Sequence, residues 1–321
     1  MSDIVVSENI TGSAMTGLRS THDVAFDSSL CQDASRLAEK LCDARALIVR
    51  NQTQVTEALI AAGPHLEIIG RAGAGLDNID TDAATEAGVV VSFTPSENSI
   101  SVAELVLGQM LTLVRCFPAA WQDTRNGGWD RQQFTGGELF QKTLGIVGLG
   151  RIGRLVAERA RAFGMTLIAH DDFIDPTADF VRDLNVSLVS LDELLAQADY
   201  VTVHVPLTEQ TRGLFSLARF RQMKPSARLI NASRGEVIDE ADLITALQEN
   251  LIAGAALDVR ETEPPEPGPL SEMDNVILTP HIGAFTREAQ ERVVATVCQD
   301  VTTVLAGGEA RSPFALSRPQ R

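Results

Sequence analysis

The stretch LGIVGLGRIG, residues 144–153, decides the fold because it joins an apolar strand, a glycine-rich turn and the start of a helix. Residues 151–163 continue it with apolar positions at helical spacing, and Gly164 ends that pattern. In GxGxxG the first glycine permits a tight turn, the second lets backbone approach a pyrophosphate, and the third lets helix and strand pack closely. The stretch therefore predicts a dinucleotide site that contains Gly148, Gly150 and Gly153.

A carboxylate follows the next predicted strand, residues 166–170. Asp171 has the spacing from the glycines at which a carboxylate accepts hydrogen bonds from the ribose 2′-hydroxyl of a dinucleotide. Asp172 adds a second negative charge, and residues 170–175 include no Arg or Lys to bind the 2′-phosphate of NADP. The sequence therefore predicts NAD as the cofactor. Two solvated loop carboxylates are the alternative reading of this pair.

Short apolar runs alternate with helical patterns along the chain, as is typical of parallel sheets wound with crossover helices. They form one set before about residue 95 and another after about residue 143, with a helical stretch at 101–117 between them. The predicted fold is α/β, with a flavodoxin-like substrate domain and a Rossmann-type NAD-binding domain. The predicted strands are residues 46–50, 66–70, 88–93, 144–148, 166–170, 200–205, 227–231 and 275–280.

A chain of 321 residues is long enough for two domains and for a cleft between them. The last helical pattern, residues 287–305, has no strand after it, so we expect it to pack on the first sheet. We therefore predict a substrate-binding domain of residues 1–98 and 288–321 and an NAD-binding domain of residues 99–287.

The formal charge of −16 disfavours nucleic acid and anionic membranes as partners, because both bind basic surfaces. The same charge repels an anionic substrate, which would need a local cluster of Arg, Lys or backbone N–H groups. The N-terminus lacks a signal-peptide pattern and no apolar run reaches 18 residues, so we expect a cytoplasmic protein. The cysteines lack metal-ligand spacing and are expected to be reduced, and no metal site is predicted; they are Cys31, Cys42, Cys116 and Cys298.

Proton transfer to a carbonyl near neutral pH needs a group that titrates there, and histidine is the usual one. His204 and His281 each follow a predicted strand of the second unit, where open α/β sheets bind their ligands. Small residues after His281 would leave its imidazole free to face a cleft, although a generic loop histidine fits this pattern equally. The other three, His22, His65 and His170, are expected at the surface or beside the adenosine.

With these motifs the chain resembles the D-isomer-specific 2-hydroxyacid dehydrogenases, and in particular phosphoglycerate dehydrogenases. The resemblance rests on motifs in combination along most of the chain. They are ALIVRNQTQV (46–55), GRAGAGLDNID (70–80), TPSENSISVAE (94–104), the segment 136–165 around the glycines, VTVHVPLTEQTRGLF (201–215), NASRGEVIDEADLITAL (231–247), GAALDV (254–259), ETEPP (261–265) and TPHIGAFTREA (279–289).

The resemblance implies a catalytic triad of Arg234, Glu263 and His281. In the implied mechanism Arg234 binds the substrate carboxylate and polarises the C2 oxygen, and Glu263 holds the imidazole and favours its cationic form. His281 exchanges the hydroxyl proton while hydride passes between C2 and nicotinamide. Further NAD contacts implied are Arg151, Ile152, His204, Pro206, Thr211, Asp258 and Gly283, with a strand-terminal cap as the alternative for Asp258.

Substrate contacts are implied at the first unit as well. The loop 71–75 can form an anion-binding nest, and the resemblance assigns the substrate carboxylate to the N–H groups of Ala74 and Gly75. Arg50 and Asn51 match the position where phosphoglycerate dehydrogenases present an Arg to the phosphate, and Asn98 also matches a site position. We therefore expect a small anionic 2-hydroxy or 2-keto acid with a second anionic group. A solvated surface Arg and a turn-capping Asn are the alternatives.

Departures from the family pattern limit the prediction of one substrate. Phe93 replaces a usual Asn, Gln141 a usual Gly and Phe285 a smaller residue, and the two Phe side chains could reshape the pocket. A general 2-keto acid (glyoxylate or hydroxypyruvate) reductase is therefore the alternative enzyme, and a non-enzymatic NAD-sensing corepressor the remote one. From the resemblance we also expect a homodimer with residues 101–131 in the interface, and no appended regulatory domain after Arg321.

Overall fold

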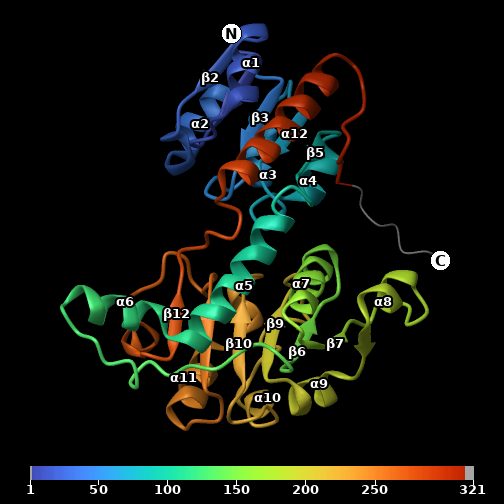
Figure 1. The fold of residues 1–321 in the computed structure, drawn as a ribbon. Helices are drawn as coiled ribbons and strands as arrows, with labels where there is room; N and C mark the ends of the chain where they lie inside the picture. The colour runs from blue at the N-terminus through green and yellow to red at the C-terminus, as the bar shows by residue number, and fades with distance from the viewer. Residues whose placement is uncertain (1, 315–321) are drawn as a thin grey trace. The chain divides into compact units, whose positions relative to one another are not determined.

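The computed structural model describes residues 2–314, which form two compact units (Figure 1). Unit 1 consists of the described residues of Met1–Asn98 and Ala284–Arg321, and unit 2 of Ser99–Gly283. The chain returns to unit 1 at Ala284 and not at residue 288. Met1 and residues 315–321, which the predicted substrate-binding domain includes, lie outside the described residues.

Unit 1 contains a five-stranded parallel sheet in the order β2-β1-β3-β4-β5. This is the flavodoxin-like order, with the chain reversing direction across the sheet between β1 and β3. The sequence predicted β3, β4 and β5 but missed β1 and β2, which have three residues each. The strands are β1 (Ile4–Val6), β2 (Val24–Phe26), β3 (Ala46–Val49), β4 (Ile68–Arg71) and β5 (Val90–Ser92).

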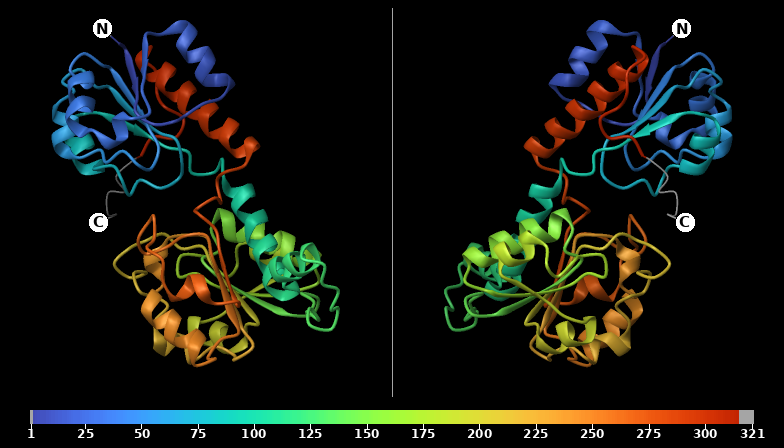
Figure 2. Two further views of the ribbon diagram at one scale, coloured as in Figure 1. Left: turned by 90° about the vertical axis from the view of Figure 1, so that its left-hand side faces the viewer. Right: turned by 90° about the vertical axis from the view of Figure 1, so that its right-hand side faces the viewer.

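Alternate residues of these strands enter two apolar layers, because successive side chains of a strand point to opposite faces. Ile48 lies in the layer with α12, whereas Leu47 and Val49 lie in the opposite layer. Helices α1 (Ser13–Thr21) and α12 (Arg287–Leu305) cover the first face, as Figure 2 shows for the blue and red helices. The other face is covered by α2 (Ala34–Leu41), α3 (Glu57–Ala61) and α4 (Thr81–Glu86), with η1 (Leu30–Gln32) beside them.

Unit 2 contains a seven-stranded parallel sheet in the order β12-β11-β10-β9-β6-β7-β8. Counted from β6, this is the Rossmann order with one added strand, and the chain crosses over between β6 and β9. The predicted fold class of two doubly wound parallel sheets is therefore confirmed. The strands are β6 (Thr143–Val147), β7 (Thr166–His170), β8 (Val186–Leu188), β9 (Tyr200–Val203), β10 (Arg228–Asn231), β11 (Gly254–Leu257) and β12 (Val276–Leu278).

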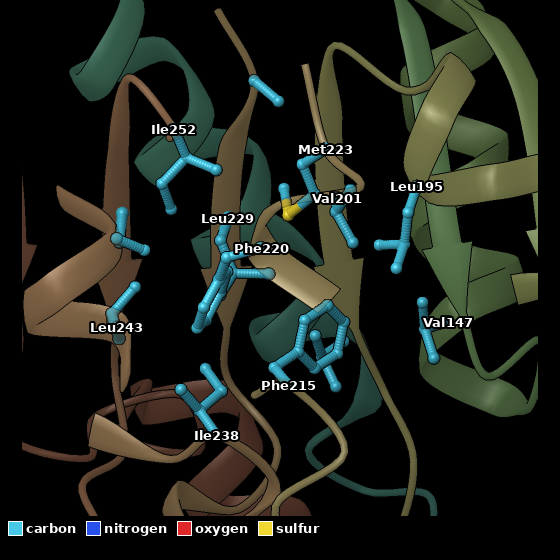
Figure 3. Close-up of a cluster of buried hydrophobic side chains, with 14 of the residues drawn as sticks. Val147, Leu195, Val201, Phe215, Phe220, Met223, Leu229, Ile238, Leu243 and Ile252 are labelled. Carbon is cyan, nitrogen blue, oxygen red and sulfur yellow. The ribbon is translucent and has the colours of Figure 1, made fainter. Parts of the chain in front are cut away.

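Two apolar layers also flank the sheet of unit 2. Figure 3 shows one of them, where Phe215 and Phe220 pack with ring centroids 6.3 Å apart below the strand residues Val201 and Leu229. The helices of this layer are α9 (Leu191–Gln197), α10 (Leu217–Phe220) and α11 (Glu240–Gln248), with η2 (Gly235–Val237) and η3 (Pro269–Glu272). The opposite layer contains α5 (Ser99–Arg115), α7 (Arg151–Ala162) and α8 (Asp179–Leu184).

Helix α5 is largely buried, and α6 (Phe117–Arg125) follows it after Cys116. Among residues 2–314 no single helix is long and apolar enough to cross a membrane. In the described part of the chain only the pair α5 and α6 reaches that length and hydropathy together, and the two helices meet at a 62° bend.

The two parallel sheets determine where the candidate site residues lie. All strands of a parallel sheet end at the same edge, so the loops that follow them are neighbours there. In unit 2 these loops begin at Gly148, His204, Ala232, Asp258 and Thr279, after β6, β9, β10, β11 and β12. The predicted triad and NAD residues therefore all belong to one edge of one sheet or to loops that start there.

Candidate active site

The three glycines of 148–153 meet three different packing demands. Gly148 has a φ of 93°, and a Cβ atom there would lie 2.8 Å from the backbone of His204. A Cβ on Gly153 would lie 2.2 Å from the carbonyl oxygen of Gly148, so α7 could not begin where it does. Gly150 has no other atom within 4 Å of its Cβ position. The first and third glycines thus serve packing, and the second borders open space that a ligand can approach.

Helix α7 begins beside that space. Gly150 is its N-cap and supplies no side-chain hydrogen bond, so the first N–H groups, beginning at Arg151 and Ile152, have no cap. The helix has 12 residues, and such an N-terminus attracts anions through its N–H groups and its dipole. Arg154 donates from Nε to the carbonyl oxygen of Leu149 at 3.0 Å, which fixes the loop from within the helix. These features fit the pyrophosphate of a dinucleotide.

Asp171 lies at the end of β7, beside the same loop. Its Oδ2 accepts the N–H of Leu149 at 2.8 Å, and its Oδ1 accepts the N–H of Phe173 at 3.0 Å. Each oxygen keeps a lone pair for another donor, such as a ribose hydroxyl. Asp172 makes no such contact with the loop; its side chain is 80% exposed and lies 3.8 Å from His170. The carboxylate held against the glycine loop is thus Asp171.

The predicted acid-base pair is formed within unit 2. Nδ1 of His281 lies 2.7 Å from Oε2 of Glu263, and both side chains are partly open to solvent. Because Glu263 engages Nδ1, the Nε2 atom is left for a substrate proton. The backbone of His281 has a φ of 53°, a left-handed conformation that non-glycine residues seldom adopt and that occurs often at functional sites. A carboxylate therefore orients an imidazole whose side chain solvent can reach.

Electrostatics keep Glu263 ionised and bring Arg234 into the same site. Burial is the largest single influence and raises the pKa of Glu263, but the hydrogen bond and charge of His281 and the backbone N–H of Arg260 lower it. The positive charge of Arg234 acts in the same direction, and the net pKa of Glu263 lies below its usual value. Arg234 is therefore close enough for its charge to act on the pair. Among the three residues of the predicted triad, His281 and Glu263 are in direct contact and the charge of Arg234 acts on the same carboxylate.

The loop that carries His281 is fastened by Asp258, which is 1% exposed. Its Oδ1 accepts the hydroxyl of Thr279 at 2.6 Å and the N–H of Ile282 at 2.9 Å, and its Oδ2 accepts the N–H of Gly283 at 2.8 Å. The N–H of His281 also donates to the carbonyl oxygen of Asp258 at 2.8 Å. Asp258 therefore acts as a cap at the end of β11, and these hydrogen bonds do not depend on a bound cofactor.

The loop that carries Arg234 is fixed in a similar way. Asn231 donates from Nδ2 to the carbonyl oxygen of Arg234 at 2.8 Å, and the Arg234 side chain donates to the carbonyl oxygen of Ser233. Gly235 follows, where a Cβ would lie 2.0 Å from the carbonyl oxygen of Arg260. Glycine after Arg234 thus permits the close approach of this loop to the loop that leads to Glu263.

His204 is near the glycine loop, but it cannot serve as the acid-base group near neutral pH. Burial lowers the pKa of His204 from its ordinary value of 6.5 to about 3, so the ring is neutral. Its ring Nε2 lies 2.9 Å from the hydroxyl of Thr202, and its backbone N–H donates to the carbonyl oxygen of Val147. Beyond it, Thr211 donates to the carbonyl oxygen of Pro206 at 2.6 Å and closes the loop 206–211.

In unit 1 the loop after β4 presents unused N–H groups. Gly73 has a φ of 157° and accepts the N–H of Thr94 at 3.0 Å, which holds the loop against the next strand. Within residues 2–314 the N–H groups of Ala74 and Gly75 donate to no other protein group. Both residues are partly exposed, so an external anion can reach these donors. This is the arrangement expected of an anion-binding nest.

Arg50 is not a solvated surface residue. Its guanidinium lies 4.4 Å from the centroid of the Phe285 ring and donates to the side-chain oxygen of Gln290. Burial lowers its pKa, and the nearby Glu8 opposes this effect. Arginine stays charged in either case, so a partly desolvated cation is held in place after β3. Of the other predicted contacts in unit 1, Asn51 is exposed and Asn98 is partly buried.

The sequence analysis missed two residues that hold Arg50 in place, Glu8 and Gln290. Glu8 is 3% exposed, and its carboxylate accepts N–H groups of Arg50 at 2.7 Å and of Gln52 and Thr53 at 3.1 and 3.0 Å. It fixes the turn from which Arg50 projects. Gln290 also holds Arg50, from the first turn of α12. Glu8 follows the short strand β1, so recognising that strand would have pointed to it.

Known proteins resemble this chain over most of its length. The family described as D-isomer specific 2-hydroxyacid dehydrogenase, NAD binding domain, matches residues 107–283, so the chain belongs to this family. It is 44% identical over 308 residues to a D-3-phosphoglycerate dehydrogenase of Methanocaldococcus jannaschii, covering 96% of this chain. That match covers 58% of the relative, so the chain spans little more than half of its length.

Solved structures match over nearly the whole chain. The TT0316 protein from Thermus thermophilus is 32% identical, with a TM-score of 0.90, and the match covers 97% of this chain and 99% of that one. A glyoxylate reductase from Paecilomyes thermophila is 30% identical, with a TM-score of 0.86, and 97% of each chain is covered. The fold with two α/β units is therefore shared with solved relatives, one of which is named a glyoxylate reductase.

The depressed pKa of His204 predicts a pH-dependent stability. Between about pH 6.5 and pH 3 the unfolded chain binds a proton at His204 that the folded chain does not, so stability is lost as the pH falls through this window. We expect His204→Gln to reduce the slope of unfolding free energy against pH by up to about 1.4 kcal/mol per pH unit. Urea unfolding followed by circular dichroism at pH 4.5–7 measures it, with the exposed His65→Gln as control. Equal slopes in wild type and both variants would contradict this assignment.

Proposed function

We propose that this member of the D-isomer specific 2-hydroxyacid dehydrogenase family is an NAD-dependent oxidoreductase that transfers hydride between nicotinamide and C2 of a small D-2-hydroxy acid. We further propose that the acid carries a second anionic group, as in 3-phosphoglycerate or sulfolactate. The observation that carries the proposal is the 2.7 Å contact between His281 and Glu263, with the charge of Arg234 acting on the same carboxylate. Such a trio both binds a carboxylate and moves a proton.

Each residue of the trio has a distinct task in this proposal. Arg234 binds the substrate carboxylate and polarises the oxygen at C2, because its guanidinium can donate to two oxygens at once. Nε2 of His281 gives a proton to that oxygen during reduction and takes one from the hydroxyl during oxidation. Glu263 accepts from Nδ1, which fixes the ring orientation and stabilises the imidazolium. When bound, the nicotinamide ring supplies or accepts the hydride.

The residues that would hold NAD are those of the loop after β6 and the carboxylate after β7. The open space at Gly150 and the uncapped start of α7 fit a pyrophosphate, and Asp171 fits a ribose diol. The hydrogen bond between Gly283 and Asp258 holds the loop of His281. Thr211 and Pro206 hydrogen bond to each other in the loop after β9. We assign substrate binding to unit 1 and NAD binding to unit 2.

Arg50 is the proposed ligand of the second anion, and Ala74 and Gly75 the proposed donors to the substrate carboxylate. The proposal is supported by the partly desolvated guanidinium, which Phe285 and Gln290 hold, and by the two unused N–H groups. The name of the relative from Methanocaldococcus jannaschii supports a phosphorylated acid. A general 2-keto acid reductase is the second candidate, supported by the similarity to the glyoxylate reductase.

We also propose that the protein is a homodimer through residues 101–131. Trp121 and Trp129 are 60% and 77% exposed in or beside α6, and Phe117 is 49% exposed, so this segment presents apolar surface suited to a partner copy. Light scattering at micromolar concentration tests this proposal, and a monomeric mass would contradict it.

His281→Ala is expected to lower turnover by about 10²–10⁴-fold, the usual contribution of a general acid-base group. NADH affinity should survive, because in the proposed mechanism the imidazole acts on the substrate oxygen and not on the cofactor. Steady-state reduction of 2-keto acids and NADH fluorescence titration measure the two quantities. His65→Ala, in which an exposed histidine is removed, is the control. Near-normal turnover of His281→Ala would overturn the proposed function.

Asp171→Ala is expected to narrow the preference for NADH over NADPH by about tenfold or more. Two unit charges 4 Å apart repel by about 4 kcal/mol at an effective dielectric constant of about 20, and about 1.4 kcal/mol already corresponds to tenfold. The ratio of kcat/KM for the two cofactors measures the preference. Asp172→Ala is the matched control, because this exposed neighbour does not contact the glycine loop and should change the ratio less. Equal use of both cofactors by the wild type would refute the assignment of NAD.

Arg50→Ala is expected to lower kcat/KM for 3-phosphoglycerate or sulfolactate by roughly 10–150-fold, the value of one charge-assisted hydrogen bond. D-lactate has one carboxylate, which Arg234 and the loop 71–75 are proposed to bind, so its kcat/KM should change little. Arg36→Ala removes a surface cation paired with Asp27 in the same unit and controls for net charge. Equal losses for lactate and for the dianions would make Arg50 structural and favour the general 2-keto acid reductase.

A further inference from the structure

Glu240 and Arg260 form a shielded ion pair next to the loop that carries Glu263. Arg260 donates from Nε and Nη2 to the two carboxylate oxygens of Glu240 at 2.8 and 2.7 Å. The two side chains are only 13% and 17% exposed. Glu240, the first residue of α11, also accepts the N–H of Glu261 at 2.8 Å. This carboxylate therefore holds both the side chain of Arg260 and the backbone that follows it.

A short series of contacts joins this ion pair to the imidazole. The backbone N–H of Arg260 donates to Oε1 of Glu263 at 3.1 Å, and the other oxygen of Glu263 lies 2.7 Å from Nδ1 of His281. The backbone at Arg260 also packs directly on Gly235, the residue after Arg234. A displacement of Arg260 would thus change the positions of Glu263, His281 and the loop that carries Arg234.

Arg260 is positively charged, so its position determines how strongly it interacts with the neighbouring carboxylates, including Glu263. The hydrogen bond to Glu240 is the largest influence that raises the pKa of Arg260, and the charges of Glu261 and Glu263 raise it further. The guanidinium therefore lies within electrostatic reach of Glu263, the carboxylate that His281 uses. Other charged groups near these carboxylates are Glu236 and Asp239, from η2 and the N-cap of α11, and Arg234.

Open space adjoins the ion pair of Glu240 and Arg260. A pocket of about 300 Å³ opens beside it, lined by Glu240, Ile244, Arg260, Glu261 and Pro269. If Glu240 lost its charge, the guanidinium would have space to turn and a second carboxylate to bind. Glu263 lies three residues further along the same loop.

We propose that Glu240 is a positioning residue for proton transfer: by binding Arg260 on both oxygens, it keeps that cation away from Glu263 and leaves Glu263 to His281. This inference rests on the proposed function of the Glu263 and His281 pair. It assigns Glu240 no contact with substrate or cofactor.

Glu240→Gln tests the inference, because it removes the charge and keeps the size and one acceptor oxygen. We expect turnover in keto-acid reduction to fall by about 10–100-fold, the scale of an active-site displacement of about 1 Å, with NADH affinity unchanged. The pH midpoint of kcat/KM should move to lower pH, because an imidazolium that shares its carboxylate with Arg260 loses its proton more readily. Glu236→Gln is the matched control, since it removes a charge from the same region without contacting Arg260.

The double variant Glu240→Gln, Arg260→Met separates positioning from simple structural support. Removal of the competing cation should return turnover and the pH midpoint toward the wild-type values, a coupling that a double-mutant cycle quantifies. Glu240→Asp, which keeps the charge, should retain most of the turnover. Circular dichroism melting shows whether each variant is folded at the assay temperature.

Each remaining outcome has a distinct meaning. If Glu240→Gln retains wild-type turnover and pH midpoint while His281→Ala is inactive, the role of Glu240 is wrong and the proposed function stands. If Glu240→Gln loses turnover and the double variant recovers none of it, Glu240 is structural and the inference is overturned. Normal turnover of His281→Ala would instead remove the proposed function on which the inference rests.

Discussion

The backbone N–H groups of the loops that follow the parallel strands need acceptors, and in this protein carboxylates supply many of them. Asp258 accepts from Ile282 and Gly283, Glu8 from three residues of the turn after β3, and Asp171 from Leu149. After helix α12 the same arrangement recurs, because the fully buried Asp300 of that helix accepts the N–H groups of Arg311 and Ser312. A buried N–H group without a partner costs about 1–3 kcal/mol, so these carboxylates determine the loop conformations. The candidate site residues lie on loops held in this way.

The elements predicted correctly are those whose signal is local. The stretch 144–153 and helix α12 were predicted because turn chemistry and helical periodicity lie within a few residues of each other. The missed strands β1, β2 and β8 have three residues each, and β11 has the sequence GAAL without a β-branched residue. Strands β5 and β12 are equally short, but they lie within the longer runs 88–93 and 275–280, which the sequence did reveal. The missed strands exist because neighbouring strands pair with them and helices cover them, and a single sequence does not display that information.

The site was predictable to a lesser degree, because its residues are distant in the chain. Residue patterns alone suggested His281 as one loop histidine among others, and the family resemblance supplied Arg234 and Glu263. The three donors on Asp258 and the ion pair of Glu240 with Arg260 depend on how separate loops meet, so spacing could not reveal them. At Gln141, in contrast, a departure seen in the sequence has a local explanation. Its φ is 59°, a left-handed conformation that glycine adopts more easily, so a glycine is usual there.

The charge of −16 and a proposed dianionic substrate are compatible because of where the cations and acceptors lie. At physiological ionic strength charges are screened over about 8 Å, so most surface carboxylates act weakly on a bound anion. Glu8, the carboxylate whose charge acts on Arg50, already accepts three N–H groups, which offset its charge. Arg50 itself is stacked on Phe285 and bonded to Gln290, so little side-chain entropy is left to lose when an anion binds. For the proposed dianionic substrate, net charge would therefore affect the rate of association, and the preorganised local donors would determine which acid stays bound.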